Sequence, residues 1–294
     1  REIQNHALEA KNVFAGLRKL QNRFEDVYNS VDDDKKLHNK VGVILTLFNK
    51  EERARFVRDY FLEKNQIKNI DEYLKLVYLG VSHTEIMKEL SGENNKADSN
   101  EADIVQQKKE ELLNAMRNND IYKAGYEYAC IQLLRRNVEQ DILLGRVFNF
   151  EIWKSGNRSL EHIYPKSKVY YADNIGNIYR GDDKPVTPQE KQEIENGDKK
   201  WLNRDSFENN GSEHCIGNLV LLYHNENSGF NDSNFDRKKS LYFDLMKDKT
   251  FRSRHLLHSI AVFANGDWGV KQIQANKEKF IAEIKTYYGI QEIK

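Results

Sequence analysis

Apolar positions in the first 145 residues recur at three- and four-residue steps, a spacing that places them on one face of a helix. The run "ALEAKNVFAGLRKLQNRFEDVY" keeps this spacing from Val13 to Val27. No proline occurs before Pro165, so this part of the chain lacks the strongest helix breaker. We therefore predict an α-helical domain over residues 1–145.

Further helices are predicted in this domain from the same pattern. Asn49 is a suitable N-cap for the run "KEERARFVRDYFLEK". The runs "NIDEYLKLVYLG" and "SHTEIMKELSG" each end on a glycine, which is a common stop signal for a helix. A polar segment without apolar anchors, residues 91–103, is predicted to be a flexible loop. The predicted helices are "HNKVGVILTLF", "KEERARFVRDYFLEK", "NIDEYLKLVYLG", "SHTEIMKELSG" and "YKAGYEYACIQLLRRN".

The pattern changes after residue 145, where β-favouring residues alternate with polar ones. This indicates three strands and a return to helix towards the C-terminus, so the predicted fold class is α+β. Residues 168–213 hold two prolines and four glycines and are predicted to be a long irregular insertion. The predicted strands are "RVFNFEIW" (146–153), "RSLEHIYP" (158–165) and "IGNLVLLY" (216–223), followed by helices at "FDRKKSLYFDLM" and "WGVKQIQANKEKFIAEIKTYY".

Composition limits the classes of function. Lys plus Arg and Asp plus Glu both number 46, so a surface for nucleic acid has to be a local patch. The two cysteines, Cys130 and Cys215, exclude a four-cysteine zinc site and fit a reducing, cytoplasmic location. No apolar run approaches 18 residues, so no membrane span is predicted. The chain opens at Arg1 inside a predicted helix, and we expect it to be a piece of a longer protein.

The first candidate for chemistry is His162 in "SLEHIYPKS". A neutral imidazole can take a proton from water at neutral pH. Glu161 points to the opposite face of an ideal strand, although twist near a strand end can bring both groups to one metal-water cluster. A lone histidine in a strand can equally be structural or merely exposed.

Two asparagines follow in "IGNLVLLYHNENSGF". Asn218 interrupts an apolar strand, and a buried amide needs hydrogen-bond partners, although a turn residue at the strand start is an equal alternative. Asn227 lies nine residues later, and its amide oxygen suits a magnesium ion. Viewed alone, Asn227 also fits a polar loop.

Together these residues resemble the HNH nucleases, which have the ββα-metal fold. The resemblance consists of an acidic residue and His before "IYP", Asn in "GNLVLL", a second Asn nine positions on, and a helix with basic residues. It implies that His162 is the general base, Glu161 and Asn227 are metal ligands, and Asn218 fixes a loop. It also implies a nuclease domain over 146–294 with additional C-terminal helices, although the insertion at 168–213 exceeds the compact family core.

A narrower resemblance covers most of the chain. The helical part with "FEDVYNSVDDDKKLHNKVGVILTLF", placed before this nuclease motif, is similar to the C-terminal portion of GmrSD-type restriction endonucleases, which act in bacterial phage defence on modified DNA. The resemblance implies DNA, including modified phage DNA, as the substrate. It also implies an N-terminal nucleotide-hydrolysing domain, supplied by a missing segment or a partner chain, because no GxxxxGK[ST] loop occurs here.

The residue types then suggest a mechanism of phosphodiester hydrolysis. One Mg2+, or another divalent ion such as Mn2+, held by Glu161 and Asn227 would neutralise charge, and His162 would activate water. Lys238 and Lys239 would contact backbone phosphates, unless they lie on an ordinary solvated helix face. The alternatives are a catalytically inactive DNA-binding or regulatory module of the same fold, and an HNH nuclease that acts on RNA.

The remaining candidates are weaker. His224 lies between the two asparagines and is a minor candidate for the base. His255 and His258 sit beside leucines in a predicted helix and are interpreted as packing or surface residues. Cys215 is interpreted as a small buried residue, and no nucleophile-elbow motif supports Ser-His-Asp catalysis.

Overall fold

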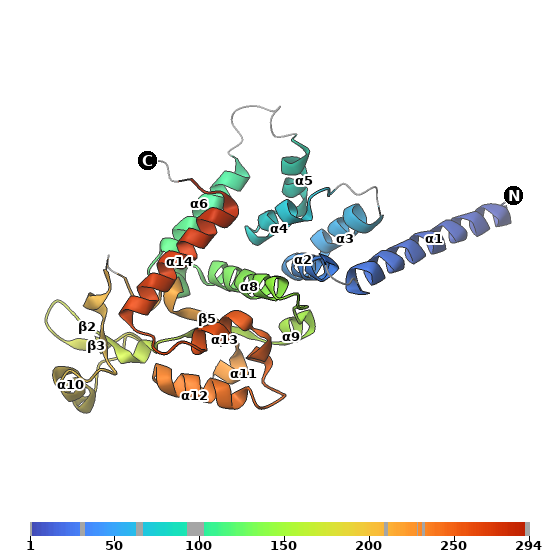
Figure 1. The fold of residues 1–294 in the computed structure, drawn as a ribbon. Helices are drawn as coiled ribbons and strands as arrows, with labels where there is room; N and C mark the ends of the chain where they lie inside the picture. The colour runs from blue at the N-terminus through green and yellow to red at the C-terminus, as the bar shows by residue number, and fades with distance from the viewer. Residues whose placement is uncertain are drawn as a thin grey trace. The chain divides into compact units, whose positions relative to one another are not determined.

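The computed structural model describes residues 2–29, 33–62, 67–92, 103–208, 211–227, 229–230 and 233–291. It is mainly helical, with small sheets in the middle of the chain, which confirms the predicted α+β class (Figure 1). The chain divides into two compact units, each treated by itself below: Arg1–Lys108 with Asp141–Phe150, and Lys109–Gln140 with Glu151–Lys294. The predicted domains 1–145 and 146–294 stay a prediction.

The first unit is built from helices whose ends follow the predicted signals. Their bounds are α1 Glu2–Asn29, α2 Asp33–Leu47, α3 Lys50–Val57, the π-helix η1 Arg58–Leu62, α4 Ile70–Tyr78 and α5 His83–Ser91. Asn49 caps α3 in a reciprocal capping box with Glu52. Gly80 and Gly92 follow α4 and α5 with positive φ, the conformation that glycine adopts most easily. Of the predicted loop 91–103, residues 93–102 lie outside the described part.

A polar network is buried inside this unit. The Nε2 atom of His83 lies 2.8 Å from the Asp59 carboxylate, and its Nδ1 atom lies 2.5 Å from the Tyr73 hydroxyl. Arg58 also donates to Asp59. Burial alone would raise the pKa of Asp59, but the hydrogen bonds from Arg58 and His83 outweigh it and lower that pKa. Both ring nitrogens of His83 are therefore engaged.

The prediction of a strand at 146–153 is wrong. The structure has the helix α9, Phe150–Ser155, preceded by residues without regular structure. Phe148 is buried and its backbone N–H donates to Asn39, which takes the place of a strand partner. A short aromatic run fits either element, and packing decides between them.

The described part of the second unit contains a two-stranded and a three-stranded sheet together with helices (Figure 1). Helices α6 Ile104–Arg117 and α8 Tyr126–Leu143 contribute residues to both units. The other bounds are α7 Ile121–Ala124, β1 Arg158–His162, η3 Lys166–Lys168, β2 Val169–Ala172, β3 Ile178–Arg180, α10 Pro188–Glu195, β4 Leu202–Asn203, η4 Arg204–Ser206, η6 Ile216–Asn218, β5 Leu219–Tyr223, α11 His224–Asn227, α12 Phe235–Leu245, η7 Arg252–His255, α13 Leu257–Phe263 and α14 Val270–Tyr288.

Strands β1 and β5 form an antiparallel pair. They confirm the predicted strands at 158–165 and 216–223 in part, because β1 ends at His162 and residues Ile216–Asn218 form a 3-10 helix. Arg158 pairs with Tyr223 at one end of the pair, and His162 with Leu219 at the other. Every residue of β5 is buried, so the continuous apolar run reflects burial on both faces. Val220 and Leu222 belong to a core cluster with aromatic residues from α12 and α13, including Tyr242 and Phe263. This core holds the His162 end of the pair in place.

Residues 168–213 are more regular than the sequence suggested. They contain a three-stranded sheet in the order β3-β2-β4, in which β2 pairs antiparallel with β3 and parallel with β4. Thr187 caps α10 in a capping box, and Pro188 occupies its first turn. The strands have two to four residues each, too short for their alternation to be read from the sequence.

Close packing against α14 explains the glycine beside Asn218. A Cβ atom on Gly217 would lie 2.1 Å from the carbonyl oxygen of Ile273, and Asn276 donates to the Gly217 carbonyl.

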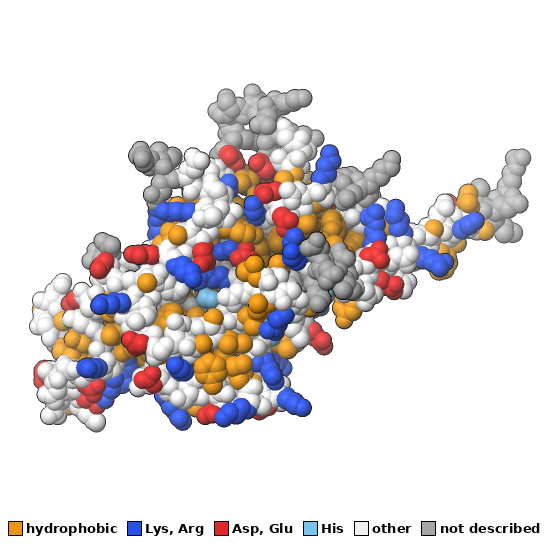
Figure 2. All heavy atoms as spheres, in the orientation of Figure 1, with side chains coloured by type: hydrophobic (Ala, Val, Ile, Leu, Met, Phe, Trp, Pro, Cys, Tyr) orange, Lys and Arg blue, Asp and Glu red, His pale blue; other side chains and the backbone are white. Residues whose placement is uncertain are grey.

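Both cysteines are free, and Cys215 is buried as predicted. Within the described residues, no helix is long and apolar enough to cross a membrane. On the face shown in Figure 2, basic and acidic side chains are interspersed.

Candidate functional site

His162 is the last residue of β1, and its side chain is buried against the loop that precedes β5. Its Nε2 atom lies 3.0 Å from Nδ1 of His214, and the two rings meet edge to face with centroids 5.1 Å apart. The Tyr122 ring of α7 lies 4.5 Å from the His162 ring. Burial, with a smaller contribution from nearby positive charges, holds the pKa of His162 well below its ordinary value. The imidazole is therefore neutral at neutral pH, as a general base must be.

Glu161 contacts helix α12, whereas His162 contacts the loop before β5. Lys238 of α12 is 1% exposed, and its ammonium donates to the Glu161 carboxylate and, at 2.6 Å, to the backbone carbonyl of His162. The sequence suggested phosphate contact or a solvated helix face for Lys238, and the side chain is instead buried in an ion pair. Removing one partner of such a pair leaves an uncompensated buried charge. Lys238 therefore ties α12 to the end of β1.

Asn218 uses its whole amide to join two chain segments. Its Oδ1 atom accepts from the backbone N–H of Tyr164 at 2.8 Å, and its Nδ2 atom donates to the carbonyls of Tyr164 and Glu213, both at 2.9 Å. The side chain is completely buried. These contacts fix the turn after His162 to the loop that carries His214. They fit the loop-fixing role that the sequence resemblance implies.

The two remaining predicted residues are not brought to His162 by any described contact. Lys239 donates to the carbonyl of Asn265, at the end of α13. Asn227 is the last residue of α11, and its side chain lies outside the described part. The roles of both residues stay predictions.

Lys166 is a partly exposed cation that follows the turn after His162. It begins η3 directly after the turn that Asn218 fixes. Its ammonium lies 5.5 Å from the centre of the Tyr122 ring, and its charge contributes to the lowered pKa of His162. Lys166 thus places a positive charge near the His162 ring.

The donor atoms around Glu161 are oxygens, but they are few for a divalent cation. Among the described residues, no group of three or more His, Cys, Asp or Glu side chains could hold a metal ion. The Glu161 carboxylate and the His162 carbonyl are nevertheless hard oxygen donors, the type that Mg2+ prefers. They already hold one buried positive charge, the Lys238 ammonium. The donor type of this position therefore suits a positive charge, and the Lys238 ammonium occupies it.

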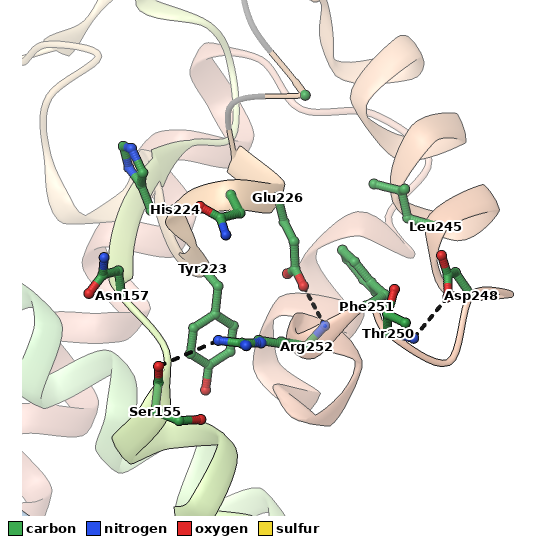
Figure 3. Close-up of a pocket in the computed structure, with 12 residues that line it drawn as sticks. Ser155, Asn157, Tyr223, His224, Glu226, Leu245, Asp248, Thr250, Phe251 and Arg252 are labelled. Carbon is green, nitrogen blue, oxygen red and sulfur yellow. Dashed lines mark hydrogen bonds between the residues drawn. The ribbon is translucent and has the colours of Figure 1, made fainter.

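A pocket of about 500 Å3 lies at the other end of the strand pair (Figure 3). It is lined by Tyr223 and His224, whereas His162 sits at the opposite end of β1, about 13 Å along a five-residue strand. Glu226 holds one wall by accepting from the backbone N–H groups of Arg252 and Ser253. This pocket is separate from the His162 site.

His255 and His258 have packing roles. His255 is buried, with Nε2 2.7 Å from the Tyr223 hydroxyl. His258 is also buried, and burial lowers its pKa to about 3. The packing interpretation of both residues is confirmed, and the alternative surface placement is wrong.

Sequence reasoning missed His214, which the structure places against His162. The signal was present, because "SEHC" repeats the Glu-His pair of "LEHI". His214 lies directly after residues 168–213, the segment predicted to be irregular. Arg204 binds both carboxylate oxygens of Glu213, which anchors the same loop.

Comparison with known proteins gave one family match. The model of the C-terminal domain of GmrSD restriction endonucleases matches residues 106–283, more than half of the chain. The matched range includes the β1–β5 pair and every candidate site residue discussed above. No curated protein and no solved structure matched the chain.

Proposed function

Since the chain belongs to the family of C-terminal domains of GmrSD restriction endonucleases, we propose that it is a metal-dependent DNA endonuclease with His162 as the general base. The observation that carries this proposal is the neutral, buried His162 at the end of β1, anchored through one ring nitrogen only. Among the described residues, Nδ1 of His162 has no hydrogen-bond partner. The ring therefore has a nitrogen to offer to a water molecule.

In the proposed reaction, His162 takes a proton from water while the water oxygen bonds to phosphorus. The bond between phosphorus and the leaving 3′ oxygen breaks, and that oxygen is protonated from solvent. Lys166 holds a phosphate oxygen of the scissile strand, and Asn218 keeps the turn between His162 and Lys166 in shape. This use of charge and positioning is the usual basis of phosphodiester cleavage.

A divalent ion would be held by Glu161 and, as the resemblance implies, by Asn227. When bound, it would supply positive charge beside the scissile phosphate. Glu161 would then share its carboxylate between the ion and Lys238. Lys239 is proposed to contact backbone phosphate farther along α12.

Relaxation of supercoiled plasmid DNA tests the proposal. The purified chain and its His162→Ala variant are assayed with Mg2+, with EDTA, on plain and base-modified plasmid, and on RNA. We expect Mg2+-dependent nicking by the wild-type chain alone, with no loss of folding in EDTA. Wild-type rates in the variant would overturn the assignment of His162.

The assay also separates two other functions. The buried pair of Glu161 with Lys238 neutralises the proposed metal ligand, and this favours an inactive DNA-binding module as the second candidate. DNA binding without cleavage under any divalent ion would support it. Cleavage of RNA alone would support the ribonuclease alternative.

A further inference from the structure

His214 lies behind the candidate base, on the side of its Nε2 atom. Nδ1 of His214 is 3.0 Å from Nε2 of His162, and Nε2 of His214 is 3.2 Å from the backbone carbonyl oxygen of Gly181. The same nitrogen is 3.4 Å from the Glu213 carboxylate. His214 is thus held between His162 on one side and two oxygen acceptors on the other.

These acceptors determine which nitrogen of His214 carries the proton. A backbone carbonyl and an ionised carboxylate can only accept hydrogen bonds, so Nε2 of His214 must be the N–H group. In a neutral ring the other nitrogen, Nδ1, is then an acceptor. A hydrogen bond between the two histidines therefore requires Nε2 of His162 to donate. A neutral His162 is left with its lone pair on Nδ1.

From this chain of donors and acceptors, we infer that His214 is a positioning residue that holds His162 in the tautomer protonated on Nε2. Nδ1 of His162 is then the atom that receives the proton of the attacking water. The inference rests on the proposed function, in which His162 is the base. It adds the identity of the reactive nitrogen and the residue that selects it.

The loop around His214 is built to hold the ring still. The backbone N–H of His214 donates to Ser212 Oγ at 3.1 Å, and its carbonyl accepts from the backbone N–H of Tyr122 at 3.3 Å. The Glu213 carboxylate receives two hydrogen bonds from Arg204. Burial lowers the pKa of His214, against the opposing effect of nearby carboxylates, which favours the neutral ring.

Gly181 makes the acceptor side of this arrangement possible. A Cβ atom at this position would lie 2.2 Å from a carboxylate oxygen of Glu213 and 2.5 Å from the carbonyl oxygen of Lys166. Any side chain at 181 would therefore push Glu213 away. The short distance from the Gly181 carbonyl to His214 depends on this close approach.

The test combines a spectroscopic signature with a conservative rescue. Nitrogen-15 NMR of the 294-residue chain, labelled at histidine, reports which ring nitrogen of His162 is protonated, and the signal is assigned from His162→Ala. We expect the proton on Nε2 in the wild-type chain. His214→Asn keeps an acceptor close to the position of Nδ1 and should preserve both the tautomer and kcat.

His214→Leu removes that acceptor. We expect a mixture of His162 tautomers and a fall in kcat on the order of 10–100-fold, with KM little changed, as is typical when an orienting partner of a histidine is lost. Thermal melting shows whether His214→Leu folds. If it does not fold, the wild-type spectrum and the His214→Asn variant still test the tautomer of His162. A proton on Nδ1 of wild-type His162, or an unchanged tautomer and kcat in folded His214→Leu, would overturn the inference. Full activity of His162→Ala would instead remove the proposed base and leave the tautomer assignment intact.

Discussion

His83 in the first unit and His162 in the second are both buried beside aromatic rings, but their ring nitrogens are used differently. His83 has both nitrogens engaged, by Asp59 and by Tyr73. His162 has only Nε2 engaged, by His214, among the described residues. The first ring closes a polar network, and the second leaves one nitrogen for a substrate.

This difference separates a structural histidine from a candidate base better than burial does. His83 and His162 are 3% and 5% exposed, so their accessibility does not distinguish them. A fully hydrogen-bonded ring can take a proton only if an existing hydrogen bond is broken or reversed. The unused nitrogen is therefore the feature to test.

The largest expected effect is on catalysis at His162. We expect His162→Ala to lower kcat/KM for plasmid nicking by about 10²–10⁴-fold, the usual loss when a general base is removed. The melting temperature should fall less than in His83→Ala, because one hydrogen bond rather than two is lost. His224→Ala is the matched control, because His224 is an exposed histidine in the same unit, and its rate should equal that of the wild-type chain. Equal losses in the two variants would contradict the role of His162.

His83→Ala should give the opposite result. Removing this ring leaves Asp59 with Arg58 as a partner but takes from it the hydrogen bond of His83, and it takes from the buried Tyr73 hydroxyl its contact with Nδ1. We expect the free energy of unfolding to fall by about 3 kcal/mol. Urea denaturation measures this loss. Cleavage by the fraction that remains folded should match the wild-type chain. A stable but inactive His83→Ala protein would show that the first unit takes part in the chemistry.

Changing Asn218 should affect both stability and catalysis, because its amide holds two chain segments together and lies close to the candidate base. Asn218→Ala removes three hydrogen bonds, and we expect a loss of about 1–3 kcal/mol in stability together with a slower rate. Asn218→Asp keeps the acceptor for the Tyr164 N–H and loses the two donor bonds. Because its second carboxylate oxygen would face the carbonyls of Tyr164 and Glu213 in a buried site, chemical denaturation should rank the aspartate variant no higher than the alanine variant. Undiminished stability in Asn218→Ala would refute the loop-fixing role.

The effect that is smallest at neutral pH concerns His258, whose Nε2 atom is buried without a hydrogen-bond partner among the described residues. Its folded pKa of about 3 lies below the ordinary value of 6.5, so the unfolded chain binds a proton that the folded chain does not. Stability is therefore complete above pH 6.5 and falls as the pH is lowered towards 3, by up to about 1.4 kcal/mol per pH unit. Melting curves from pH 7 to pH 4 should show a shallower decline for His258→Leu. Parallel declines would contradict this assignment.

The sequence predicted the fold class, the strands around Glu161 and Leu219, and the helix caps at Asn49 and Gly92, because each depends on local chemistry. It did not predict α9, since the aromatic run at 146–153 fits a strand as well as a helix. It also did not predict the burial of Lys238, because the pairing with Glu161 joins residues far apart in the chain. His214 was missed for the same reason, since only the folded loop places it against His162.

The pairing of β1 with β5 joins strands separated by all of residues 163–218, and this has a consequence for the order of folding. The entropy of closing a loop rises with its length, so this contact is slow to form compared with the local β2–β3 pair. Early formation of the β2–β3 sheet would shorten the effective loop. His162 meets His214 and Lys238 only when the long-range pair closes. We therefore expect the proposed nuclease activity to return in the slowest phase of refolding, later than the circular dichroism signal of the helices. Activity that returns before that phase would show that β1 and β5 need not be paired.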